Sequence, residues 1–225
     1  MNLTDLPLGE QAILMLAGLV LFTSFSLLAQ PRIVAAIRTF AWQGVLLSVV
    51  TALVAYDTGL HHLYLSALLT LLMKAIFIPW LLHKLVHKME FQREQDVLHH
   101  PVLVLMGGAA LVIFCYSIAL PIQKLSISVT QPIIALSMAM VMLAMLMLIT
   151  RHKAVSQVIG FMAMENGLFF AAVSATHGMP MVVELGIAFD VFVAAIIFGV
   201  FFFHIKDSFD SLDVDRLSSL SESDE

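Results

Sequence analysis

The sequence predicts an all-α membrane protein, a polytopic bundle of about seven transmembrane helices with the N-terminus outside and the C-terminus in the cytoplasm. Three observations lead to this prediction. First, 60% of the 225 residues are hydrophobic and only 12% are charged, whereas soluble domains are about half apolar and a quarter charged. Second, apolar runs of roughly 20 residues, enough to cross about 30 Å of hydrocarbon, recur along the chain. Third, lysine and arginine gather in alternate loops.

Seven segments are long and apolar enough to span a membrane. They are Gln11–Ala29, Val34–Tyr56, Leu63–Leu85, Val102–Leu120, Pro132–Thr150, Val155–Thr176 and Val183–Phe203. Runs of this length are expected to be helical, because lipid offers no partner to unpaired backbone groups. The second segment is the least regular, since Arg38 and Gln43 shift its apolar part toward Gly44–Tyr56.

Turn-forming stretches separate most of these segments. The first ends at "AQPR" (29–32), and "HHP" (99–101) precedes the fourth. "LPIQK" (120–124) follows the fourth, "TRHK" (150–153) separates the fifth from the sixth, and "THGMP" (176–180) separates the sixth from the seventh. Proline and glycine in such clusters end helices, so the segment boundaries agree with local chain chemistry.

The distribution of basic residues predicts the orientation. If the N-terminus is outside, the outer loops contain only Lys124. The inner loops and the inner tail then contain Arg32, Arg38, Lys84, Lys88, Arg93, Arg151, Lys153, Lys206 and Arg216. Cytoplasmic loops are enriched in Lys and Arg, so we expect a transmembrane bundle over residues 1–203 and an acidic cytoplasmic tail over residues 204–225.

Three ionisable residues lie inside predicted spans, namely Lys74, Glu165 and Asp190. A charge at the centre of a bilayer costs about 2.5–3.5 kcal/mol on insertion scales, so an intramembrane charge is a functional hypothesis by default. Pro79 follows Lys74 by five residues and lacks the amide that would bond the carbonyl of Ala75 in an α-helix. We therefore expect a local irregularity beside the lysine that could hold water.

The expected depths of these residues favour lateral proton transfer. At a rise of about 1.5 Å per residue, Lys74 and Glu165 fall near the midplane and Asp190 about one turn outward. Burial favours the neutral forms of carboxyl groups and amines, so such groups can exchange protons near neutral pH. We assign Lys74, Glu165 and Asp190 as relay groups. The supporting polar residues are Gln43, Asn166 and Glu184.

Two other readings of the same residues remain open. Lys74 could pair with Glu165 or Asp190 as a static bridge, in a bundle that only anchors other subunits. The chain could also be an independent small secondary transporter, although polar groups at graded depths, which a private pathway needs, are scarce. The small residues Gly160, Ala163, Gly167 and Ala171 favour helix packing over a binding role.

The sequence gives no sign of a catalytic or cofactor site. All nine histidines fall in loops or near helix ends, which argues against haem or metal binding within the membrane. There is no CxxC motif, phosphate-binding glycine loop or nucleophile elbow. We expect no catalytic residues, no metal, no bound cofactor and no nucleic-acid partner.

Four motifs resemble component E of hydrogenase-4-type complexes, the membrane-bound nickel–iron hydrogenases of the formate hydrogenlyase type. They are "MENG" (164–167), "VELGIAFD" (183–190), "MKAIFIPWLL" (73–82) and "SLDVDRLSSL" (211–220). More distantly, the sixth and seventh spans resemble the small K subunit of respiratory complex I and the C subunit of multisubunit cation/proton antiporters. Those subunits carry one acidic residue on each of two consecutive helices, positions that Glu165 and Asp190 match here.

The resemblance implies a non-catalytic subunit of an inner-membrane oxidoreductase complex that couples a redox reaction to proton or sodium translocation. It also implies the partners, which are antiporter-like and K- or H-type membrane subunits and, on the cytoplasmic side, peripheral hydrogenase and iron–sulfur subunits. Lys74 has no counterpart in the small complex I subunit, so its relay role is inferred from burial alone.

Overall fold

The computed structural model describes residues 8–88, 100–120, 130–175, 186, 188–197 and 199. The helices are α1 (Leu8–Ala29), α2 (Ile33–Thr58), α3 (His62–Thr70), η2 (Leu71–Phe77), α4 (Ile78–Lys88), α5 (Pro101–Ala119), α6 (Thr130–Thr150) and α7 (Ala154–Ala175). The elements α3, η2 and α4 follow one another without a break, so the described residues contain 6 spans long and apolar enough to cross a membrane. The predicted all-α, polytopic membrane fold is confirmed.

The seventh predicted span, Val183–Phe203, falls only partly within the described residues. These contain a short apolar helix, Ala188–Ile197, which supplies Asp190. The predicted tail over residues 204–225 and the predicted supporting residue Glu184 lie outside the part of the chain that the structure describes.

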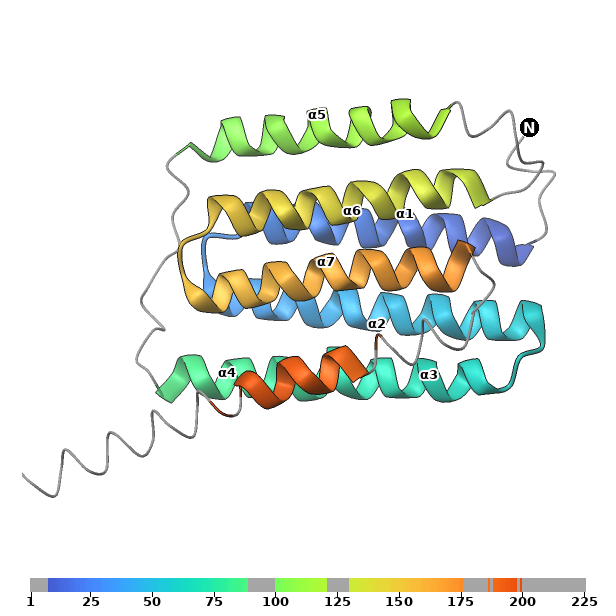
Figure 1. The fold of residues 1–225 in the computed structure, drawn as a ribbon, viewed down its shortest axis with the longest axis horizontal. Coiled ribbons are helices and arrows are strands. Elements are labelled where there is room, and N and C mark those ends of the chain that lie inside the picture. The colour runs from blue at the N-terminus through green and yellow to red at the C-terminus, as the bar shows by residue number, and fades with distance from the viewer. Residues whose placement is uncertain are drawn as a thin grey trace, which may run out of the picture.

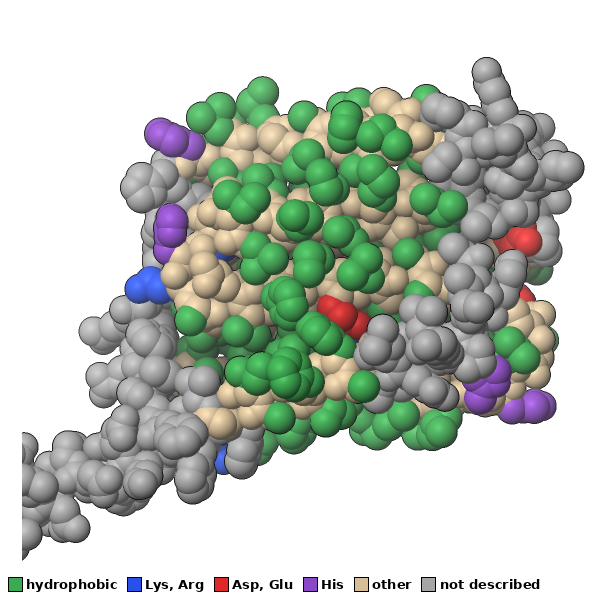
Figure 2. Space-filling view, viewed as in Figure 1, with side chains coloured by type: hydrophobic (Ala, Val, Ile, Leu, Met, Phe, Trp, Pro, Cys, Tyr) green, Lys and Arg blue, Asp and Glu red, His purple; other side chains and the backbone are tan. Residues whose placement is uncertain are grey.

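The helices run side by side, with α2 near the centre of the bundle (Figure 1). α2 packs against α1, α3, η2, α4 and α7, while α6 packs against α1, α5 and α7. α5 lies at the edge, where it contacts α6 and α1. The face drawn in Figure 2 is largely covered by hydrophobic side chains between its two ends, as expected of a lipid-facing surface.

One end of the bundle carries basic residues. The links from α1 to α2 and from α6 to α7 lie at the same end of the bundle as the C-terminal end of α4 (Figure 1). These segments contain Arg32, Lys84, Arg151 and Lys153. This grouping agrees with the charge pattern in the sequence, and the cytoplasmic placement of this end stays a prediction.

Arg151 has a structural role at that end. It is 1% exposed, and its Nη2 donates hydrogen bonds to the carbonyl oxygens of Leu28, at 2.8 Å, and Gln30, at 2.7 Å. The last carbonyls of a helix have no helical partner, and a cation is favourable beside them. Arg151, which directly follows the neighbouring helix α6, therefore caps the C-terminal end of α1.

Among the described residues, the core consists of two hydrophobic clusters with a polar layer between them. One cluster includes Phe40 and Ala163, and the other includes Leu47 and Phe169. On α2, Gln43 lies between the two clusters. On α7, Glu165 and Asn166 lie between them, and Ser24 occupies the same position on α1, between Val20 and Leu27. These polar side chains thus lie in one layer across the bundle.

Close packing of α6 on α7 explains two of the small residues on α7. A Cβ atom added to Gly167 would lie 2.9 Å from Val141 Cγ2 and 3.1 Å from the Val141 backbone nitrogen, and one added to Gly160 would lie 3.3 Å from Leu148 Cγ. Small residues let two helix backbones approach closely. Their predicted packing role is confirmed at both positions.

Candidate functional site

Lys74 lies at the centre of a buried ionic cluster. Its Nζ donates a hydrogen bond to Glu165 Oε2 and lies 3.5 Å from Asp190 Oδ2. Lys74 is 0% exposed, Asp190 1% and Glu165 8%. The three residues come from η2, α7 and the helix Ala188–Ile197, so folding brings together three segments that are far apart in the sequence.

A chain of hydrogen bonds continues from the cluster to α1. Lys74 Nζ donates to Asn166 Oδ1 at 2.9 Å, and Asn166 Nδ2 donates to Gln43 Oε1 at 3.1 Å. Gln43 Nε2 then donates to Ser24 Oγ at 2.9 Å, and Ser24 Oγ donates to the Val20 carbonyl at 3.1 Å. Because buried polar groups are costly without partners, this chain makes a polar layer tolerable inside an apolar bundle.

The third span is a π-helix where it carries Lys74. In η2 the backbone amide of Ile78 bonds to the carbonyl oxygen of Met73, five residues earlier. The next bond of this pattern would join the Lys74 carbonyl to the amide of residue 79, but Pro79 has no amide hydrogen. The predicted irregularity is therefore present as a π-helix. In this helix type Pro79 leaves the carbonyl of Lys74 without its backbone partner, whereas in an α-helix it would have been the carbonyl of Ala75. Short π-helical segments occur frequently at functional sites.

Two further residues surround the lysine. Gly44 on α2 lies against the Lys74 backbone, where a Cβ atom on Gly44 would approach the Lys74 carbonyl carbon to 2.9 Å. On the other side, Lys74 Nζ lies 4.9 Å from the ring centroid of Phe169. A cation at this distance from an aromatic face is stabilised electrostatically. The ammonium group is thus held by acceptors and by an aromatic ring while its backbone is fixed against α2.

The cluster contains one ammonium group and two carboxyl groups. If all three were ionised, the site would keep one negative charge in a low-dielectric interior, where unbalanced charge is costly. Asp190 Oδ1, moreover, accepts no hydrogen bond from any described residue. The arrangement can therefore bind one additional proton.

The structure brings together five of the six predicted site residues, Lys74, Glu165, Asp190, Asn166 and Gln43. Sequence reasoning did not identify Ser24, Gly44 or Phe169. Serine, glycine and phenylalanine are common in membrane spans and therefore do not stand out in the sequence. Only the distance of Ser24 from the ends of its helix could have indicated that it lies at the depth of the polar layer.

Comparison with known proteins identifies the chain's relatives. It is 31% identical over 205 residues to "uncharacterized protein Rv0085" of Mycobacterium tuberculosis, which covers 91% of this chain and 93% of the relative. It is 21% identical over 212 residues to hydrogenase-4 component E of Escherichia coli K12 and of Shigella flexneri, which covers 94% of this chain and 98% of the relatives. No protein-family model matches the chain. The search of solved structures gave no significant match. The chain therefore belongs to the same protein family as Rv0085, and hydrogenase-4 component E is a more distant homologue.

Proposed function

We propose that this protein is a non-catalytic membrane subunit of a hydrogenase-type complex. The homology to hydrogenase-4 component E over nearly the whole chain supports this assignment, as do the membrane-spanning helices. In such a complex the redox chemistry belongs to peripheral hydrogenase and iron–sulfur subunits on the cytoplasmic side. The membrane neighbours are antiporter-like and K- or H-type subunits.

Within that complex, Lys74, Glu165 and Asp190 transfer protons sideways through the middle of the membrane. The observation that carries this proposal is the position of one buried ammonium group within reach of two carboxyl groups. Among the described residues, the polar layer lies between two hydrophobic clusters, which favours movement within the layer over movement toward either membrane surface. Proton movement in such a layer leads toward neighbouring subunits.

The transfer follows from the exchange of partners by Lys74. When its ammonium group pairs with Glu165, as it does here, Asp190 has less positive charge beside it and holds the additional proton. When Lys74 shifts toward Asp190, 3.5 Å away, the proton leaves Asp190 and is taken up by Glu165, whose carboxylate has lost its cation. Each exchange keeps the net charge of the buried site constant, which avoids the cost of an unbalanced charge.

The hydrogen-bond chain through Asn166 and Gln43 has a positioning role in this mechanism. Asn166 Oδ1 holds the ammonium group at 2.9 Å and is fixed in turn by Gln43. The side chain of Lys74 can therefore change carboxyl partner while it keeps one acceptor, so the ammonium group is never without a hydrogen bond.

The test is Glu165→Gln in the complete complex in native membranes. Glutamine keeps the size and the hydrogen-bonding capacity of the side chain but cannot exchange a proton at this position. We expect an assembled complex that has lost coupled proton translocation, while Glu10→Gln in the first turn of α1 leaves translocation unchanged. An assembled Glu165→Gln complex that moves protons at the wild-type rate would contradict the relay.

A purely structural anchor is the competing function, and the direct contact of Lys74 with Glu165 is compatible with it. Under that function, charge-removing substitutions in the cluster alter the yield of the complex but leave the number of protons moved per turnover unchanged. Measuring both quantities in the same membranes separates the two functions.

A further inference from the structure

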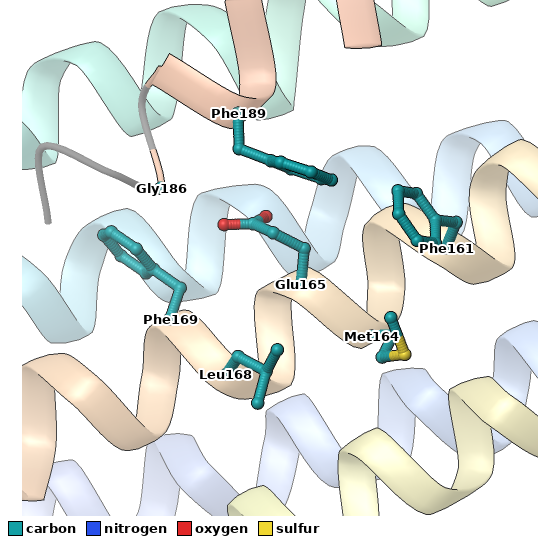
Figure 3. A pocket seen from close by; sticks show the side chains of 7 residues that line it. All are labelled: Phe161, Met164, Glu165, Leu168, Phe169, Gly186 and Phe189. Carbon is teal, nitrogen blue, oxygen red and sulfur yellow. The ribbon is translucent and has the colours of Figure 1, made fainter. Parts of the chain in front are cut away.

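A cleft opens on the outside of the bundle at the depth of the ionic cluster. Its volume is about 310 Å³, and it lies between α7 and the two residues Gly186 and Phe189 (Figure 3). The residues that line it are Phe161, Met164, Glu165, Leu168, Phe169, Gly186 and Phe189. Except for Glu165, these side chains are apolar, so the cleft is a hydrophobic recess with one carboxyl group in it.

The two carboxyl oxygens of Glu165 face different surroundings. Oε2 accepts the hydrogen bond from Lys74, whereas Oε1 faces Gly186, where an added Cβ atom would lie 3.3 Å from it. Figure 3 shows the carboxyl group between the rings of Phe169 and Phe189, beside Gly186. Of the three charged residues, Glu165 is the most exposed, at 8%. The cluster therefore reaches the cleft through the Glu165 side chain.

The absence of a side chain at Gly186 keeps this opening. A Cβ atom there would lie 3.0 Å from Phe169 Cδ2 as well as 3.3 Å from Glu165 Oε1, which is tighter than ordinary contact. A branched side chain at position 186 would fill the space in front of the carboxyl group. Gly186 thus determines whether Glu165 can be reached from outside.

The polar and apolar groups that line the cleft indicate what kind of molecule can occupy it. At this depth lipid acyl chains have no hydrogen-bond donor, and a polar group facing hydrocarbon is costly. The exposed lining around the carboxyl group is hydrophobic, with Leu168 at 55% and Phe161 at 38%, which suits the apolar surface of a helix. The occupant must therefore be apolar over most of its surface and present one donor opposite Glu165 Oε1.

We infer that this cleft receives a transmembrane helix of a neighbouring subunit, which places a protonatable side chain against Glu165 Oε1. This inference rests on the proposed function, because it identifies the point where protons pass between this chain and its neighbour. Glu165 is then the group that exchanges protons across the interface, while Lys74 and Asp190 transfer them within the chain.

Photo-crosslinking tests the occupant. The complete complex in native membranes carries p-benzoylphenylalanine in place of Leu168, at the rim of the cleft, or in place of Ile113, which is 67% exposed on α5. We expect the probe at 168 to crosslink to one membrane subunit of the complex, at a residue within two turns of a protonatable side chain, and the probe at 113 to give no crosslink to that site. Crosslinks from 168 to lipid alone, or to a second copy of this chain, would overturn the inference.

Carbodiimide labelling tests the access to Glu165. Dicyclohexylcarbodiimide is lipid-soluble and adds a protonated carboxyl group across its C=N bond, and the adduct rearranges to a stable N-acylurea. In the isolated full-length chain we expect labelling of Glu165 and none of Asp190, and in the assembled complex we expect labelling of Glu165 to be lost. Gly186→Val should abolish labelling in the isolated chain. Equal labelling of Glu165 in the chain and in the complex would contradict a covered cleft.

These measurements report contact and access rather than proton movement. If the relay hypothesis fails, the Glu165→Gln complex moves protons normally while crosslinking and protection are unchanged. If the docking hypothesis fails, crosslinking and protection are absent while Glu165→Gln still stops translocation. The two failures are therefore distinguishable.

Discussion

Gly44 packs directly against the backbone of Lys74, so that a Cβ atom on Gly44 would lie 2.9 Å from the Lys74 carbonyl carbon and 3.0 Å from its Cβ. The contact joins α2 to η2 in the layer that contains the ionic cluster. Backbone atoms cannot yield as a flexible side chain can, so this close approach requires glycine. The contact fixes the helix that carries the lysine relative to Gln43, one residue before Gly44.

Gly44→Ala is expected to destabilise the protein. The added methyl group must push η2 away from α2, and overpacking of this kind costs about 1–3 kcal/mol. The control is Gly18→Ala on α1, where a Cβ atom meets nothing within 4 Å and the higher helix propensity of alanine makes the change neutral or stabilising. Thermal unfolding of both variants in detergent measures the difference. Equal midpoints for the two variants would show that the contact is not tight.

The hydrogen bond between Asn166 and Gln43 should appear as a coupling energy. Gln43→Leu or Asn166→Leu leaves the partner amide buried and unsatisfied, at a cost of about 1–3 kcal/mol, whereas the double variant removes both groups. We expect the double variant to be more stable than the sum of the single changes predicts, by about 0.5–3 kcal/mol. A cycle between Gln43→Leu and Ser117→Ala, on exposed α5, should be additive. Additivity in the first cycle would mean that the two amides do not interact.

The membrane spans and the charged members of the site could be predicted from the sequence because each has a large energetic signature. An apolar run of about 20 residues is most often a membrane span. A charged residue within such a run needs a partner or a functional role, because its burial in the membrane is costly. For this reason Lys74, Glu165 and Asp190 stand out without any structure. Their mutual contacts, the π-helix and the cleft depend on how the helices are rotated and packed, which hydropathy does not determine.

Ser24 and Arg151 show two different reasons why parts of the structure could not be predicted from the sequence. Ser24 completes the hydrogen-bond chain, yet a serine in a span has little cost and gives no signal. Arg151 gave a strong signal as an inner-loop charge, but its burial against the end of α1 depends on tertiary packing. The charge pattern therefore grouped Arg151 with the other basic residues but missed its structural role.

Comparing Lys74→Met with the double variant Lys74→Met/Asp190→Asn tests whether Lys74 is a relay group or a static bridge. Removing the lysine alone leaves two buried carboxyl groups without a cation, and breaking a buried pair in this way costs about 3–5 kcal/mol. We therefore expect a reduced yield of the complex from Lys74→Met and a partly restored yield from the double variant. Lys84→Met, an exposed lysine on the same span, serves as the control.

Proton translocation in the same membranes gives the decisive reading. If Lys74 exchanges carboxyl partners, translocation per assembled complex is absent in Lys74→Met and stays absent in the double variant, although the yield recovers. If the lysine is only a bridge, translocation per assembled complex is normal in both variants. Translocation per assembled complex therefore distinguishes the two roles, because it stays normal for a bridge and is absent for a relay, whatever the yield.

Arg151→Met should weaken the bundle at its basic end without changing the chemistry of the ionic cluster. The guanidinium group donates to the carbonyl oxygens of Leu28 and Gln30, and methionine leaves these acceptors without that donor, at a cost of about 1–3 kcal/mol for each buried group. Arg151→Lys keeps the positive charge but lacks the planar group that reaches two carbonyls, so it should be intermediate. Arg38→Met removes an exposed arginine near the same end and should have little effect. Thermal unfolding should therefore rank the variants as Arg38→Met, Arg151→Lys and Arg151→Met in decreasing stability, whereas equal losses from Arg38→Met and Arg151→Met would mean that only the net charge of this end matters.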